Sequence, residues 1–155
     1  MDSAPTLRRP ARLWVATILN ILVGVLAVGF FIFLFASERV PDGAKPGTLD
    51  AISGGLLACL LVFYSVLALA GRSQARRAVL LLATLYFGSI IVQNALPLLG
   101  VSDSIVPARK LTANVVRNAI SLSLNWWALT STITLAFFAS RSLPPNTSLE
   151  RTREG

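Results

Sequence analysis

Apolar positions along the chain gather in four long windows that contain no charged side chain. These windows cover residues 13–37, 51–71, 78–102 and 118–140. An α-helix rises 1.5 Å per residue, so about 20 residues cross a hydrocarbon core about 30 Å thick. A surface helix of a soluble protein would show a polar face in every window. The pattern therefore predicts an all-α polytopic membrane protein, a four-transmembrane-helix bundle with helices at about 13–36, 51–70, 78–99 and 118–139.

The polar segments predict one transmembrane domain between two tails. We expect the tails at residues 1–12 and 140–155 and the four-helix domain at 13–139. The C-terminal tail is rich in Pro, Ser, Thr, Arg and Glu and is predicted to be disordered. The basic start followed by an apolar run also fits a signal peptide, but the run exceeds the usual 7–15 residues. An uncleaved first helix is expected.

The distribution of Lys and Arg predicts the orientation. With four spans both termini lie on one side of the membrane. Nine basic residues fall on that side and five on the other. Cytoplasmic loops carry the excess of positive charge, so both termini are predicted to be cytoplasmic. The opposing charges are concentrated in one loop, at Arg109, Lys110 and Arg117.

Composition supports a membrane location and argues against a nucleic-acid partner. The chain of 155 residues is 54% hydrophobic and 14% charged, whereas soluble domains are about 25% charged. The net charge of +7 comes from basic residues in short segments that flank the apolar windows. There they act as topology signals and as contacts for anionic headgroups. The lipid bilayer is the expected partner.

A polar stripe runs along the fourth window. Asn114, Asn118, Ser121 and Asn125 are separated by four, three and four positions, which places them on one face of a helix. An unpaired amide in hydrocarbon costs several kcal/mol. These side chains are therefore predicted to face other helices.

The third window offers partners for this stripe. Counted from the outer ends of the two windows, Gln93 and Asn94 lie at the depth of Ser121 and Asn125. Pro97 has no N–H to bond the carbonyl of Gln93, which leaves an acceptor there. We therefore expect one polar cluster in the outer leaflet, made of Gln93, Asn94, Pro97, Asn118, Ser121 and Asn125.

A second polar layer is predicted near the inner side. It contains Asn20 in the first window, which needs a partner, and in the other windows Tyr64, Ser65, Thr84 and Thr134. For the outer cluster two uses stand open. The amides either form an interhelical hydrogen-bond network that fixes packing, or they line a cavity that binds a small polar ligand.

Most catalytic chemistry lacks its usual residues here. The chain has no His and one Cys, and no acidic or basic residue falls well inside a predicted span. Metal sites, His-based catalysis and ion-coupled transport usually need such residues. We therefore expect a non-enzymatic protein without a cofactor or a bound metal.

Three resemblances to known families bear on this expectation. Four helices in a small chain resemble the small multidrug-resistance transporters and the quinone-linked disulfide-forming oxidoreductases. The first group depends on a Glu in its first helix and the second on Cys pairs, and this chain has neither. The turn GRSQARRAVLLL is similar to those of many uncharacterised four-helix inner-membrane proteins of bacteria, which implies a location in the bacterial inner (cell) membrane.

The C-terminal sequence PPNTSLERTREG resembles the tails of proteins encoded by bacterial integron cassettes. The resemblance implies a bacterial host and an accessory gene, and it implies no structural task for the tail. Together the observations predict an integral membrane protein that acts through helix–helix or protein–protein contacts, with its own copies or with another membrane protein. The alternative is a small channel, carrier or ligand-binding protein that uses the outer polar cluster.

Overall fold

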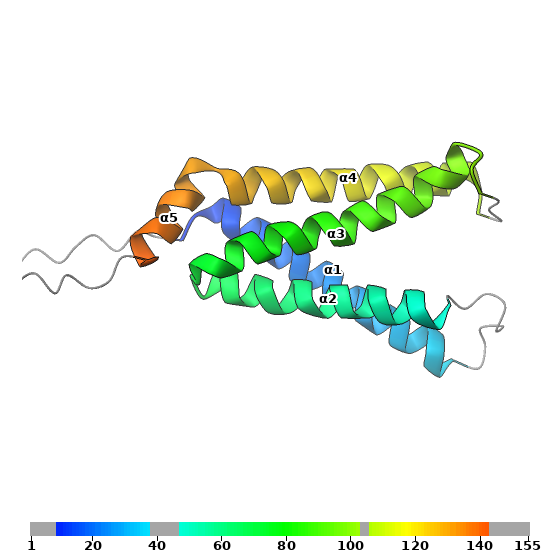
Figure 1. The fold of residues 1–155 in the computed structure, drawn as a ribbon, viewed down its shortest axis with the longest axis horizontal. Coiled ribbons are helices and arrows are strands. Elements are labelled where there is room, and N and C mark those ends of the chain that lie inside the picture. Colours follow the sequence, from blue (N-terminus) through cyan, green and yellow to red (C-terminus); the bar gives the residue numbers. More distant parts are fainter. Residues whose placement is uncertain (1–8, 38–46, 103–105, 143–155) are drawn as a thin grey trace, which may run out of the picture.

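The computed structural model describes residues 9–37, 47–102 and 106–142. In this part of the chain every regular element is an α-helix (Figure 1). The helices are α1 (Ala11–Ala36), α2 (Thr48–Leu69), α3 (Ser73–Leu98), α4 (Ala108–Thr130) and α5 (Thr132–Ser142).

The predicted all-α membrane fold is confirmed. Helices α1, α2 and α3 are each long and apolar enough to cross a membrane. Helices α4 and α5 are long and apolar enough only when taken together, and they meet at a bend of 52°. If this bent pair crosses the membrane as one span, the protein has four spans. Most of the prediction about the tails, at residues 1–8 and 143–155, lies outside the described residues.

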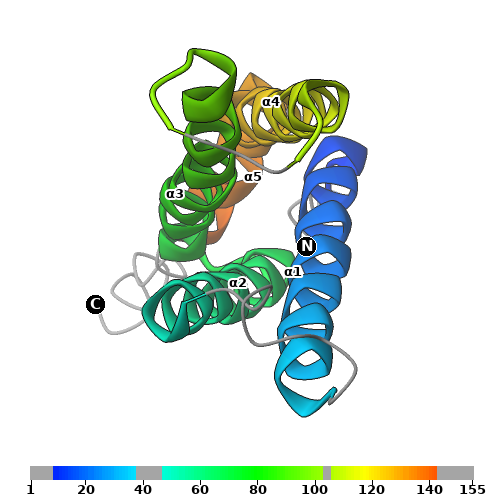
Figure 2. The same ribbon diagram turned by 90° about the vertical axis from the view of Figure 1, so that its right-hand side faces the viewer.

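The four long helices form two hairpins, α1 with α2 and α3 with α4 (Figure 1). We call the end where α1 begins and α2 ends the near end, and the end where α1 ends and α4 begins the far end. The hairpins converge at the near end and diverge toward the far end. In the end view α1 slants away from α4 toward α2 (Figure 2), and α1 and α4 accordingly share a smaller contact than the other neighbouring pairs of long helices.

Two glycines end helices in the same way. Gly71 after α2 and Gly100 after α3 have φ of 85° and 71°, a left-handed conformation that glycine adopts without steric cost. Arg72 N–H donates to the carbonyl of Leu67, and Gly71 N–H donates to that of Ala68. This pair of bonds is a Schellman motif, which satisfies carbonyls that the helix end leaves free.

Close packing of α1 on α2 depends on Gly24. A Cβ atom at this position would overlap Val62 Cγ2 and lie 3.0 Å from the carbonyl oxygen of the fully buried Ala58. The small residues Gly54 and Ala58 suggest a close approach of another helix at both positions. The structure places Gly54 against the ring of Phe31, where an added Cβ would lie 3.1 Å from the ring atom Cζ.

The fourth predicted helix differs from the observed one at both ends. Helix α4 begins at Ala108, ten residues before the predicted start at 118. The helix is interrupted at Ser131, and α5 continues from Thr132. The predicted start at 118 is the first residue after the charges at positions 109, 110 and 117. Charged residues are compatible with an α-helix, so the helix extends through them to Ala108. Pro107 precedes the first helical residue, and its carbonyl accepts a bond from Lys110 N–H at 2.8 Å.

Candidate functional site

The most buried polar contact joins α1 to α4. Asn20 Nδ2 donates to Asn125 Oδ1 at 2.7 Å, and Asn125 Nδ2 donates to Asn20 Oδ1 at 2.9 Å. Both side chains are 0% exposed. Asn125 Nδ2 also donates to the carbonyl of Ser121 at 2.9 Å. Asn20 thus has the partner that it needs, and this partner belongs to the residues predicted for the outer cluster.

The expected pairing of Gln93 and Asn94 with Ser121 and Asn125 is wrong, because α4 begins earlier than predicted. Asn125 is the eighteenth residue of α4, which places it about 25 Å from the far end at 1.5 Å per residue. Asn20 is the tenth residue of α1, counted from the near end. The two amides therefore meet at one depth.

Nearer the far end a second amide pair joins α3 to α4. Asn114 Nδ2 donates to Asn94 Oδ1 at 3.1 Å, and Asn94 Nδ2 donates to the carbonyl of Ile90 at 2.7 Å. Arg117 Nη2 donates to Asn114 Oδ1 at 3.2 Å. The Gln93 side chain is exposed on α3.

The other residues of the predicted cluster bond within their own helix or end it. Asn118 is 6% exposed and donates to the carbonyl of Asn114 at 2.8 Å. Ser121 Oγ donates to the carbonyl of Arg117 at 3.1 Å. Pro97 lies in the last turn of α3, where the helix ends. The structure thus divides the predicted cluster into two amide pairs and local bonds.

Polar side chains also satisfy the break between α4 and α5. Arg76 Nη1 donates to the carbonyl of Leu129 at 3.0 Å. Thr134 Oγ1 donates to the carbonyl of Ala128 at 2.8 Å, and Ser131 Oγ donates to the same oxygen at 3.1 Å. A cation at the C-terminal end of a helix is also favoured by the helix dipole. Sequence reasoning assigned Arg76 to a basic turn and missed this contact, which joins α3 to α4.

The two tryptophans of α4 contact other helices. Trp126 Nε1 donates to Thr84 Oγ1 on α3 at 3.2 Å. The guanidinium carbon of Arg12 lies 4.5 Å from the ring centre of Trp127, a cation–π distance. These contacts add links from α4 to α3 and to the start of α1.

In the described part of the chain, the hydroxyl oxygen Oγ of Ser65 on α2 is the one buried polar side-chain atom without a hydrogen-bond partner. Among the same residues no group of three His, Cys, Asp or Glu side chains is placed to hold a metal ion. The other described polar groups inside the bundle thus bond either within their own helix or, at the amide pairs, at Arg76 and at Thr134, across to a neighbouring helix.

An open groove lies outside the bundle core. It has a volume of about 760 Å³ and follows the side of α4 next to Leu19 of α1. Its lining is mostly aliphatic and includes Arg109, Arg117 and Ser121. Of the residues predicted for a ligand site, Ser121 is the one that reaches this groove.

The chain was compared with protein-family models, with curated proteins and with solved structures. No family model matches it, and no curated protein or solved structure gives a significant match.

Proposed function

We propose that this chain is a non-enzymatic, multi-pass protein of the bacterial inner membrane, with both termini in the cytoplasm. It works through lateral contacts of its helices with membrane helices, either of its own copies or of another protein. The amide pairs Asn20–Asn125 and Asn94–Asn114 support this proposal because their side chains form hydrogen bonds with one another inside the bundle. The groups left for intermolecular contact are then mainly apolar helix faces and basic ends.

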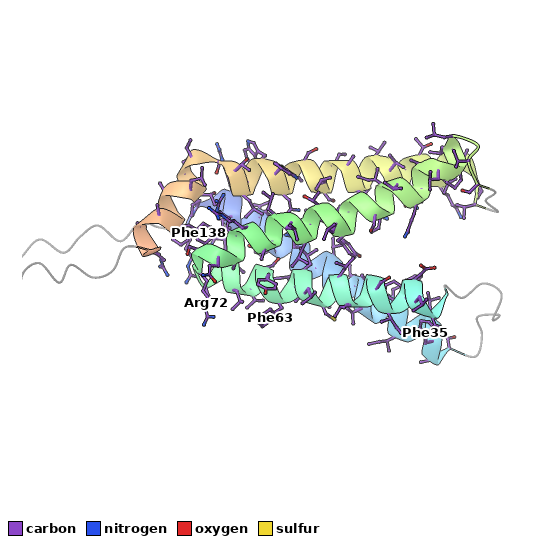
Figure 3. The ribbon with its side chains drawn as sticks, viewed as in Figure 1. Phe35, Phe63, Arg72 and Phe138 are labelled. Atoms are coloured by element: carbon purple, nitrogen blue, oxygen red, sulfur yellow. The ribbon has the colours of Figure 1, made fainter. Side chains whose placement is uncertain are left out.

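The observation that carries the proposal is the exposure of α1. Only 11% of its most apolar 18-residue window is buried by the rest of the chain. Leu22, Leu26, Phe30 and Phe33 recur every three or four positions and are 56–71% exposed. This spacing forms one stripe along the helix. Figure 3 shows further aromatic side chains, Phe35 and Phe63, on the outside of the α1–α2 hairpin.

Photo-crosslinking in living membranes tests the proposal. A photoreactive phenylalanine analogue replaces Phe30 or Phe33, and the matched control places it at Leu81, which is 61% exposed on α3. We expect a discrete protein adduct from the α1 positions, either a dimer of this chain or a heavier complex with one other membrane protein. Adducts with lipid alone at both α1 positions would refute lateral contact through this face.

Energy transfer separates the two kinds of partner. Cys59 is the only cysteine of the chain and is exposed on α2, so donor and acceptor dyes attach at one site. Transfer that persists when liposomes of zwitterionic lipid are diluted with more lipid indicates association between copies. Transfer that falls to the random level, together with a discrete crosslinked adduct, indicates another protein as partner.

A further inference from the structure

The groove along α4 exists because α1 diverges from α4 toward the far end. Leu19 is the residue of α1 that lines the groove, and beyond it α1 slants toward α2 (Figures 1 and 2). The side of α4 between this point and the far end is left uncovered by the other described helices. The groove has a volume of about 760 Å³, and most of the surface that lines it is apolar.

The apolar wall has the length of a lipid chain. Ala113, Val116, Ile120 and Leu124 line it at intervals of three or four residues, which places them on one stripe of α4. From Arg109 to Leu124 the stripe covers about 22 Å at 1.5 Å per residue. One leaflet of a bilayer contributes about 15 Å to the hydrocarbon core. An acyl chain fits along this wall with length to spare for a headgroup.

Positive charge is concentrated at the far end of the same groove. Arg109 and Arg117 both line it. The bond from Arg117 Nη2 to Asn114 Oδ1 directs this guanidinium toward the start of α4, where Arg109 lies. An Arg side chain has five donors, and this bond uses one. Among the described residues that line the groove none is a carboxylate, and Asp50, the one acid in the described part of the chain, lies on α2.

We infer that this groove binds one anionic phospholipid, with its phosphate between Arg109 and Arg117 and one acyl chain along Val116, Ile120 and Leu124. Two guanidinium groups beside a headgroup favour a net negative lipid over a zwitterionic one, because each pairs with an anionic phosphate and no carboxylate among the described lining residues competes for them. The uncovered wall supplies the apolar contact for the chain. This inference goes beyond lateral contact through α1 and does not depend on it.

Native mass spectrometry of the full chain in mild detergent tests the inference. The protein is titrated with phosphatidylglycerol, with phosphatidylcholine of the same acyl chains, and with glycerol phosphate alone. We expect one tightly bound phosphatidylglycerol, weaker phosphatidylcholine and no retained glycerol phosphate. The substitutions Arg109→Gln and Arg117→Gln should each weaken phosphatidylglycerol binding about fivefold. Lys110→Gln is the matched control, because Lys110 is on the same helix end but does not line the groove.

A second pair of variants tests the groove apart from its charge. Ala113→Trp fills the wall and keeps both guanidinium groups, and Val92→Trp places the same ring at an exposed site on α3. We expect only the first to lower phosphatidylglycerol binding, with unchanged helix content by circular dichroism in both. Equal affinity for the two lipids, equal loss with Lys110→Gln, or unchanged binding in Ala113→Trp would each overturn the inference.

Discussion

The buried amide pair predicts a specific energetic coupling between α1 and α4. We consider Asn20→Ala, Asn125→Ala and the double variant. Removing Asn125 leaves both polar groups of the fully buried Asn20 without their bonds, since no other bond of this amide is seen among the described residues. Removing Asn20 leaves Asn125 with its bond to the carbonyl of Ser121. Asn125→Ala should therefore destabilise the protein more than Asn20→Ala.

The magnitude follows from the two bonds between the amides. A buried polar group that loses its partner costs about 1–3 kcal/mol. Interhelical hydrogen bonds in membrane proteins couple by about 0.6 kcal/mol on average and by up to about 1.7 kcal/mol. Two bonds at 2.7 and 2.9 Å therefore predict a coupling energy of about 1–3 kcal/mol. The double variant should cost less than the sum of the single variants by this amount.

The assay is reversible unfolding by sodium dodecyl sulfate in mixed micelles, followed by circular dichroism. The matched control is the cycle of Asn94→Ala with Asn125→Ala. Asn94 bonds to Asn114 and to the carbonyl of Ile90, so its loss should add to that of Asn125 without coupling. A coupling energy below about 0.3 kcal/mol between positions 20 and 125, or a larger one between positions 94 and 125, would refute the assigned pairing.

Three further predictions use matched pairs or a simple reporter. Gly24→Ala should lower the free energy of unfolding by about 1–3 kcal/mol, because the added methyl group meets α2, whereas Gly29→Ala, with nothing within 4 Å, should change it by less than about 0.5 kcal/mol; equal effects would contradict the close packing. Arg76→Met should cost about 1.5–3 kcal/mol through the lost bond to the end of α4, while Arg77→Met, at an exposed position, should be nearly neutral in the same unfolding assay. A phosphatase that is active only in the periplasm, fused after Gly155, should be inactive if the C-terminus is cytoplasmic, and its activity would reverse the proposed orientation.

The positions of the helices followed from the sequence more closely than their ends did. Windows without charge located the apolar spans, because a charge in hydrocarbon is costly. The same criterion placed the start of the last helix at residue 118, whereas α4 begins at Ala108. Charge excludes a segment from the membrane core but does not stop a helix, whose start depends on local geometry such as Pro107 before its first residue.

The sequence also identified which side chains need partners, without identifying the partners. Asn20 and Asn125 had to be bonded because an unpaired amide in an apolar setting is costly. A depth counted from residue 118 pairs Asn125 with Gln93 and Asn94. With ten more residues of helix before it, Asn125 lies instead at the depth of Asn20, and Asn94 meets Asn114.

By itself, the sequence of this protein determined an all-helical chain with up to four spans and polar groups that must be satisfied inside it. Those properties depend on the free energy of moving each residue type from water to hydrocarbon, which is local. The tertiary structure alone decided which amides pair, that Arg76 binds the break after α4, and that α1 leaves one side of α4 uncovered. These outcomes depend on the helix ends, crossing directions and relative depths of separate segments, and no short stretch of sequence contains that information.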